Sequence, residues 1–356
     1  MREVTVWILH PDPGADAGPL ERWVAAARAR IAERHRAGFL RAGAMDARIA
    51  SGPPDDTPFG VRLRELVPAT RPGPAGIVVL GSGAVPLAIK ADRAAFVDAA
   101  AADRPLALAN NRYSADIVAI ACMERLLDLP DLPADNALPR WLEEVAGYEV
   151  RDLRRRWRLA FDVDGPLELV LQGLAPDPAA DVAFVRDRLR GVAAVAADRR
   201  AELVVAGRVS TATLHWLERG VAARVRALVE ERGLRASSAL AMAGDLTAQR
   251  APASVLGLLL DRDGPGSLAA HLERVGEAAV VDTRVLLAHR IGADERRWPE
   301  PEDRFASDLL LPDRVRDPWL RELTTSAASA RIPIVLGGHS IVGPGLRIVV
   351  RANRWT

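Results

Sequence analysis

The stretch GIVVLGSGAVPLAIKADRAAF, Gly76 to Phe96, decides the fold class of this chain. It begins as an apolar, strand-like run, passes through the small-residue turn Gly81-Ser82-Gly83, and enters a helical pattern near Lys90. A strand, a short turn and a helix in this order are typical of βαβ units, in which helices cover a mainly parallel sheet. The turn has three interpretations: a phosphate-binding loop, a metal site that lacks its acidic residue, or a plain turn.

The same alternation of strand-like and helical runs continues on both sides of this stretch. In the first half VTVWIL, DARIAS, GIVVLG and PLALAN read as strands between helical segments. In the second half the strand-like runs are AELVVAG, ARVRALV, EAAVVD, IPIVLG and LRIVV. The predicted fold class is therefore α/β, with two Rossmann-like three-layer domains whose sheets are mainly parallel.

The chain length and a proline-containing segment indicate where these two domains divide. The chain has 356 residues, whereas one domain usually has about 100 to 200. The segment APDPAAD, Ala175 to Asp181, contains two prolines and no apolar periodicity, which is typical of a linker. We therefore place the first domain at residues 1–175 and the second at residues 181–356.

The composition indicates an ordinary globular protein without a strong electric field. Hydrophobic residues make up 49% of the chain and charged residues 27%, and the formal net charge is only +1. A nucleic acid partner is therefore not expected. The Arg-rich segment VRDLRRRWRLA, residues 150–160, is interpreted as a solvated face, with polyphosphate or nucleic acid binding as the alternative.

Cys122 is the only cysteine, so the chain forms no internal disulfide and no cysteine-based zinc site. A reducing compartment is therefore expected, and the localisation predicted is cytoplasmic. The sequence shows no signal peptide and no apolar run of the roughly 18 residues that a membrane span needs. Membrane association is not expected, and whether the chain forms a homo-oligomer stays open.

Three loops that follow apolar runs in the first half carry candidate binding residues. In open parallel sheets, ligands bind beyond the carboxyl ends of the strands, so we expect these loops to lie near one another. Glycines let the backbone approach a phosphate and donate amide hydrogens to it, and a lysine adds a point charge. The nucleotide-binding candidates of the first loop are Gly81, Ser82, Gly83 and Lys90; a plain turn and a solvated helix start are the alternatives.

The second loop, NNRYSAD, carries amide, guanidinium, hydroxyl and carboxylate groups within seven residues. Asn110 and Asn111 can read a nucleotide or acceptor edge, and Arg112 can bind a phosphate through two hydrogen bonds. Ser114 and Asp116 can position a water molecule or a metal, which makes Asp116 a catalytic candidate. The alternative is an Asx turn in which Ser114 caps a following helix.

The third loop, FDVDGPLEL, places Asp162 and Asp164 two residues apart. On a strand or at its end this spacing puts both carboxylates on one side, where they can hold a hard cation such as Mg²⁺. We therefore predict a magnesium site at Asp162 and Asp164, with Asp164 also a catalytic candidate. In the alternative interpretation Asp164 only caps a helix that begins at Pro166, with Glu168 in its first turn.

The second half has polar strand ends of its own. Arg208 and Ser210 follow AELVVAG, where they can bind an anion or form only a helix N-cap. Glu231, Asp282 and His339 follow or end three other strand-like runs. If these loops share one sheet edge, their carboxylates, guanidinium and imidazole suit acid–base catalysis or metal binding. His339 is the histidine expected to act in catalysis.

The element DVDGPLEL resembles the D-[IV]-D-T-P-x-D-L motif of nucleotidyltransferases similar to molybdenum-cofactor and 2-phospho-lactate guanylyltransferases. GIVVLGSGAVPL occupies the place of that family's strand and acidic D-x-P-L turn, and NNRYSADIVAI that of its substrate loop. The resemblance covers residues 1–175. It implies a nucleotidyltransferase-like first domain that transfers a nucleoside monophosphate from a nucleoside triphosphate to a phosphorylated small molecule. Pyrophosphate would leave, and Mg²⁺ would offset the charge.

The chain also departs from the pattern of that family. Residues 7–19, WILHPDPGADAGP, contain no Gly-rich nucleotide loop, and Ser82 and Gly83 stand where a metal-binding Asp is expected. These differences leave open a non-catalytic protein with a degenerate transferase fold, which binds a metabolite or a partner. A third alternative places all the chemistry in the second half, around Arg208, Glu231, Asp282 and His339.

Overall fold

The computed structural model describes residues 3–53, 55, 57–69, 75–174, 181–230 and 252–351. Contacts divide these residues into two units. The first contains residues 3–15 and 25–163, and the second contains residues 16–24 and the described residues from 164 onward. The division therefore passes between Val163 and Asp164, ahead of the predicted linker, of which residues 175–180 lie outside the described residues.

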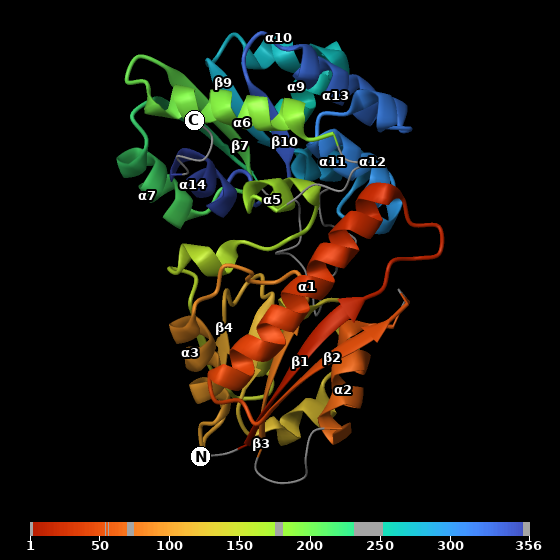
Figure 1. The fold of residues 1–356 in the computed structure, drawn as a ribbon, viewed down its shortest axis with the longest axis vertical. Helices are drawn as coiled ribbons and strands as arrows, with labels where there is room; N and C mark the ends of the chain where they lie inside the picture. The colour runs from red at the N-terminus through yellow and green to blue at the C-terminus, as the bar shows by residue number, and fades with distance from the viewer. Residues whose placement is uncertain are drawn as a thin grey trace. The chain divides into compact units, whose positions relative to one another are not determined.

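The first unit is built on a six-stranded sheet with the order β2-β1-β3-β5-β4-β6 (Figure 1). Its strands are β1 (Glu3–Pro11), β2 (Asp46–Gly52), β3 (Ala75–Gly81), β4 (Leu106–Ala109), β5 (Ile117–Ile120) and β6 (Glu149–Asp152). Strand β5 is antiparallel to β3 and β4, and the other neighbouring strands pair in parallel. The predicted α/β class is confirmed, with one reversed strand in this sheet.

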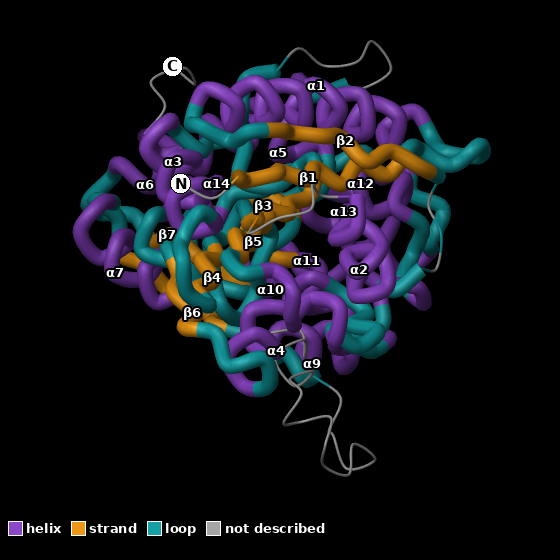
Figure 2. Tube along the Cα trace, turned by 90° about the horizontal axis from the view of Figure 1, so that it is seen from below, coloured by secondary structure: helices purple, strands orange, loops and turns teal. Residues whose placement is uncertain are grey.

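Helices cover both faces of this sheet because successive strand residues point to opposite sides. Val78 and Leu80 of β3 pack with Phe39 and Phe96, whereas Ile77 and Val79 of the same strand belong to the opposite core. The helices are α1 (Pro19–Arg41), α2 (Phe59–Ala69), α3 (Lys90–Ala100) and α4 (Leu138–Glu144). Helices α1 and α3 supply the first core and α2 and α4 the second (Figure 2).

The second unit is built on a parallel sheet of four strands with the order β10-β9-β7-β8. These are β7 (Glu202–Gly207), β8 (Arg224–Val229), β9 (Ala278–Asp282) and β10 (Ile334–Gly337). Every residue of β9 and β10 is buried, as expected for strands covered on both faces. The helices are α5 (Pro166–Leu171), α6 (Ala183–Ala197), α7 (Thr211–Gly220), α9 (Val255–Asp263), α10 (Leu268–Leu272), α11 (Thr283–Ile291), α12 (Pro301–Asp308), α13 (Pro318–Ser329) and α14 (Pro344–Arg351).

The strand predicted for LRIVV is wrong, because this run lies in helix α14. A short apolar run fits a buried strand and a buried helix equally well by periodicity alone. Here the helix begins at Pro344, and Leu346 and Val349, three residues apart, are buried on one face. The proline is the signal that favours a helix start.

Each sheet has a point at which its strand order reverses. Strand β1 lies between β2 and β3, and β7 lies between β8 and β9, so the chain leaves each first strand to one side and later returns to the other. In α/β sheets, ligands bind beyond the carboxyl ends of the strands at such switch points. The ends of β1 and β3 in the first unit, and of β7 and β9 in the second, are therefore where a site is expected.

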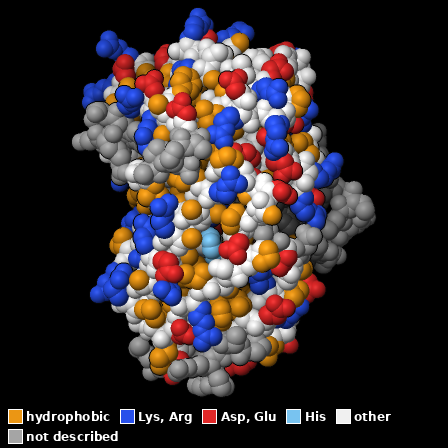
Figure 3. Space-filling model, turned by 45° about the vertical axis from the view of Figure 1, so that its right-hand side comes forward, with side chains coloured by type: hydrophobic (Ala, Val, Ile, Leu, Met, Phe, Trp, Pro, Cys, Tyr) orange, Lys and Arg blue, Asp and Glu red, His pale blue; other side chains and the backbone are white. Residues whose placement is uncertain are grey.

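The surface carries basic and acidic side chains interspersed with apolar ones on the face drawn in Figure 3. Among the described residues, none of the helices is both long and apolar enough to cross a membrane.

Candidate functional site

An ion pair stands at the switch point of the second sheet. Arg208 follows β7 and Asp282 ends β9, and the Arg208 guanidinium donates from Nε to Oδ2 of Asp282 at 2.6 Å and from Nη2 to Oδ1 at 3.0 Å. Gly207 makes this approach possible, because a Cβ there would lie 2.2 Å from the Asp282 Cβ, and its φ is +136°. The predicted meeting of Arg208 and Asp282 at one edge is thus present in the structure.

The carboxylate of Asp282 is fixed on several sides. It is 1% exposed and also accepts a hydrogen bond from the Arg284 backbone N–H, which caps helix α11. Burial acts to raise the pKa of Asp282, but the Arg208 guanidinium outweighs it and holds that pKa below its usual value. Asp282 therefore stays ionised and holds Arg208 in one orientation.

A second buried ion pair lies next along the chain. Arg284 donates from Nη1 and Nη2 to the two carboxylate oxygens of Asp308, at 2.5 and 2.6 Å. Its Nη1 also donates to the Thr283 hydroxyl, which in turn donates to the Gly337 carbonyl. Burial raises the pKa of Asp308, and the charge of Arg284 opposes that shift. This pair ties β9, β10 and α12 together beneath the edge.

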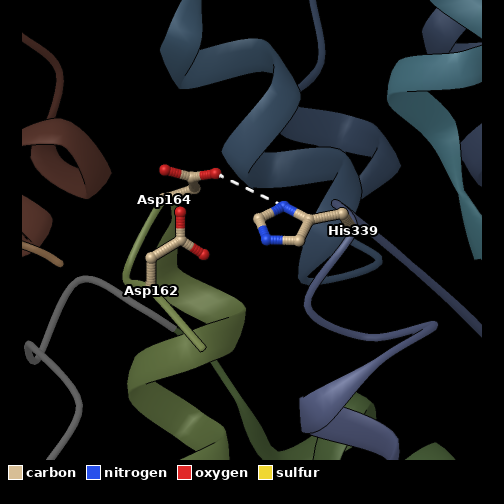
Figure 4. Close-up of side chains that lie close together, drawn as sticks. All are labelled: Asp162, Asp164 and His339. Atoms are coloured by element: carbon tan, nitrogen blue, oxygen red, sulfur yellow. Dashed lines mark ion pairs between the residues drawn. The ribbon is translucent and has the colours of Figure 1, made fainter. Parts of the chain in front are cut away.

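Asp164 and His339 form the most open part of the same edge. Oδ2 of Asp164 lies 3.9 Å from Nδ1 of His339, and the two side chains are 56% and 30% exposed (Figure 4). Asp162 is buried and stands two residues earlier on the segment that leads to α5, where its carboxylate oxygen lies within 4.8 Å of that of Asp164. Carboxylate and imidazole groups at this spacing can hold a divalent cation.

Asp164 is not the cap of helix α5, so that alternative is wrong. The N-cap is Gly165, and the Glu168 carboxylate accepts a hydrogen bond from the Gly165 N–H at 2.9 Å. Glu168 performs the capping that the sequence allowed for Asp164.

The turn after β3 is fixed by a histidine. His10 lies in β1, and its Nδ1 is 3.0 Å from the hydroxyl oxygen of Ser82, both side chains being buried. The next residue, Gly83, has no room for a side chain, because a Cβ there would lie 2.8 Å from the Val163 carbonyl oxygen. The Val163 N–H donates a hydrogen bond to the Gly83 carbonyl. Burial lowers the pKa of His10, and Asp12 opposes that shift.

The NNRYSAD loop bonds mostly to its own unit. Asn110 donates to Asp116 at 2.7 Å and to the Leu159 carbonyl at 2.9 Å, and its oxygen accepts from the Asp116 N–H at 3.0 Å. Asn111 accepts from the Tyr113 N–H, so the predicted Asx turn is confirmed. The helix expected after Ser114 is absent, because strand β5 follows there. Ser114 itself is exposed.

The remaining predicted ligand residues have different surroundings. Arg112 donates to Glu143 at 3.2 Å and to the Val150 carbonyl at 2.5 Å. Lys90 is exposed at the first position of α3. Ser210 is the N-cap of α7 and accepts from the Thr213 N–H at 3.2 Å, as the capping alternative predicted. Glu231 lies outside the described residues.

The Arg-rich segment is largely engaged in ion pairs of the first unit. Arg156 and Arg158 both contact the buried Asp92, at 2.9 and 3.2 Å. Arg151 pairs with Glu149 at 2.6 Å, and the Arg154 guanidinium lies 5.8 Å from the centre of the Tyr113 ring. These contacts engage much of the cluster within its own unit.

Sequence reasoning missed His10 and Asp308. His10 had a usable signal, because it closes the apolar run VTVWILH and so stands at a strand end. Asp308 had none, because it ends helix α12, 24 residues along the chain from Arg284, and no motif links the two.

We compared the chain with protein-family models, curated proteins and solved structures. None of the three comparisons found a match.

Proposed function

We propose that the protein is a divalent-cation-dependent nucleotidyltransferase-like enzyme. It would transfer a nucleoside monophosphate from a nucleoside triphosphate to a phosphorylated small molecule, with release of pyrophosphate. The observation that carries this proposal is the pairing of Asp164 with His339 at an open sheet edge, with a second carboxylate, Asp162, on the same short segment. Phosphoryl chemistry needs such a cation site because negative charge must be offset at the reacting phosphate.

The donor set fits a divalent cation. Carboxylate oxygens are the ligands that Mg²⁺ prefers, and an imidazole nitrogen beside them also suits Mn²⁺ or Zn²⁺. Within the second unit Asp164 would hold the cation and His339 would supply the nitrogen, and Asp162 stays a predicted ligand. When bound, the cation would neutralise charge on the phosphate that is being transferred.

The other residues of the second-sheet edge would act by position and charge. Asp282 holds the Arg208 guanidinium through two hydrogen bonds and leaves it 20% exposed, so that Arg208 can face a phosphate oxygen without reorganising. Catalysis in such reactions comes mainly from placing the reacting groups and from preorganised charge. Asp116, bonded to Asn110, stays a catalytic prediction.

A non-catalytic binding protein with a degenerate transferase fold is the second candidate. Asn110 and Arg112 were predicted to bind the nucleotide, but their side chains form hydrogen bonds with neighbours in their own unit. These bonds favour the non-catalytic candidate. Both candidates predict ligand binding, and only the enzyme predicts pyrophosphate release.

Titration calorimetry with a panel of nucleoside triphosphates, each with and without Mg²⁺ or Mn²⁺, tests the proposal. We expect cation-dependent binding in the wild type, and a loss of about tenfold or more in affinity for Asp164→Asn. Asp313→Asn, at an exposed aspartate of the same unit, is the matched control and should bind like the wild type.

A pyrophosphate-release assay on the same samples, with a panel of phosphorylated small molecules added as acceptors, separates the two candidates. Release that Asp164→Asn abolishes supports the enzyme, and binding without release supports the non-catalytic protein. No heat with any nucleotide contradicts the enzyme.

A further inference from the structure

The buried pair His10 and Ser82 stands at the switch point of the first sheet. Leu9 of β1 is in register with Gly81 of β3, so His10 and Ser82 are the next residues along two neighbouring parallel strands. His10 is 8% and Ser82 2% exposed, and Nδ1 of His10 lies 3.0 Å from Oγ of Ser82. The pair therefore occupies the place where a ligand of this sheet is expected.

The hydrogen bond fixes which nitrogen of His10 carries the proton. Within the part of the chain that the structure describes, the Ser82 hydroxyl has no side-chain partner other than His10 Nδ1. If Nδ1 carried the hydrogen, the Ser82 hydroxyl hydrogen would be buried without an acceptor, which is unfavourable. Ser82 therefore donates to Nδ1, and the hydrogen of the neutral imidazole is on Nε2.

Nε2 of His10 is then a hydrogen-bond donor. Among the described residues it has no hydrogen-bond partner, and it is not one of the side-chain atoms that are both buried and unpartnered, so it is open to solvent. An open donor at the end of a strand is available to a ligand that binds beyond that end.

The charge around His10 favours an anionic acceptor. The Arg28 guanidinium lies beside the turn: a Cβ built on Gly83 would be 3.0 Å from Arg28 Nε. Arg28 Nε donates to the Val163 carbonyl at 2.7 Å. Burial and, to a smaller extent, Arg28 lower the pKa of His10, so the ring is neutral at neutral pH, while the exposed Asp12 acts in the opposite sense. A neutral donor beside a guanidinium suits a phosphate oxygen.

We propose that His10 donates from Nε2–H to the phosphate of a phosphorylated ligand that binds at this edge of the first sheet, and that Ser82 is its positioning residue. This inference rests on the proposed function for the class of ligand only. It changes the role predicted for the Gly81–Gly83 turn: Ser82 acts through His10 instead of binding the ligand itself.

Nitrogen-15 NMR of the imidazole rings of the full chain, titrated with inorganic tripolyphosphate and no divalent cation, tests this inference. We expect the free protein to show His10 as the Nε2–H tautomer, and tripolyphosphate to shift its ring signals. Potassium chloride at equal ionic strength should not shift them. His215, exposed on α7, is the internal control and should not respond.

Ser82→Ala provides a second readout that a merely structural serine would not give. It should mix the two tautomers of His10 and weaken tripolyphosphate binding about tenfold, whereas His215→Gln changes neither. A free protein with the hydrogen on Nδ1, or His10 signals that tripolyphosphate leaves unmoved, overturns the inference. Nucleotide calorimetry judges the proposed function separately, since it can fail while His10 still responds to tripolyphosphate.

Discussion

His35 shows how one buried side chain links helix α1 to the turn after β3. It is 1% exposed, and its Nε2 lies 2.8 Å from the Ala84 carbonyl oxygen, which fixes Nε2 as the donor. Its Nδ1 is buried without a partner among the described residues. Burial lowers the pKa of His35 to about 4, so the ring is neutral in the folded protein near neutral pH.

This residue should make the protein less stable in mild acid. Between the unfolded pKa of 6.5 and the folded pKa of about 4, the unfolded chain takes up a proton that the folded chain refuses, so stability falls as the pH falls. From about pH 7 to about pH 4.5 the loss in unfolding free energy is about 2 kcal/mol. Urea denaturation at both values should show a smaller loss for His35→Gln than for the wild type and His215→Gln. Equal losses in all three would contradict the shifted pKa.

Among the elements of the second unit, the Arg284–Asp308 pair joins the start of α11 to the end of α12. Both side chains are buried and meet through two hydrogen bonds. Removing one partner of such a pair leaves a charge without compensation, whereas replacing both by apolar groups often restores stability. The pair therefore gives a sharper test of packing than an exposed ion pair.

We expect Asp308→Asn to lower the unfolding free energy by about 3 to 5 kcal/mol. The double variant Arg284→Met with Asp308→Leu should recover most of that loss. Asp187→Asn, which breaks the exposed Arg190–Asp187 pair, should change stability by less than about 1 kcal/mol. Urea denaturation measures all three, and a double variant no more stable than Asp308→Asn would show that the charge is not the cause.

Most elements follow from apolar periodicity; the exceptions are LRIVV, which is a helix, and strands β5 and β6, which were not predicted. LRIVV is too short for its period to separate a strand from a helix, and its burial on one helix face is decided by the surrounding unit. The direction of β5 could have been predicted. Only residues 110–116 connect β4 to β5, and a parallel neighbour needs a crossover of about a dozen residues or more.

At the scale of the whole molecule, the sequence predicts where a site lies better than which residues meet there. The rule that ligands bind beyond strand ends marked Arg208, Asp282 and His339 correctly as edge residues. Their partners depend on the strand order, which places β9 beside β7 although β8 comes between them in the chain. The bonding of Asn110 to Asp116 likewise depends on the turn between two strands, which residue type alone does not reveal.

The central claim is that Asp164 and His339 hold a divalent cation, and its most direct test is Mn²⁺ binding to the full chain, measured by electron paramagnetic resonance of the free ion. We predict that the wild type and Asp313→Asn bind Mn²⁺, and that Asp164→Asn and His339→Ala each weaken binding by about tenfold or more. A wild-type chain that leaves all Mn²⁺ free, or variants that bind it as the wild type does, would contradict the claim.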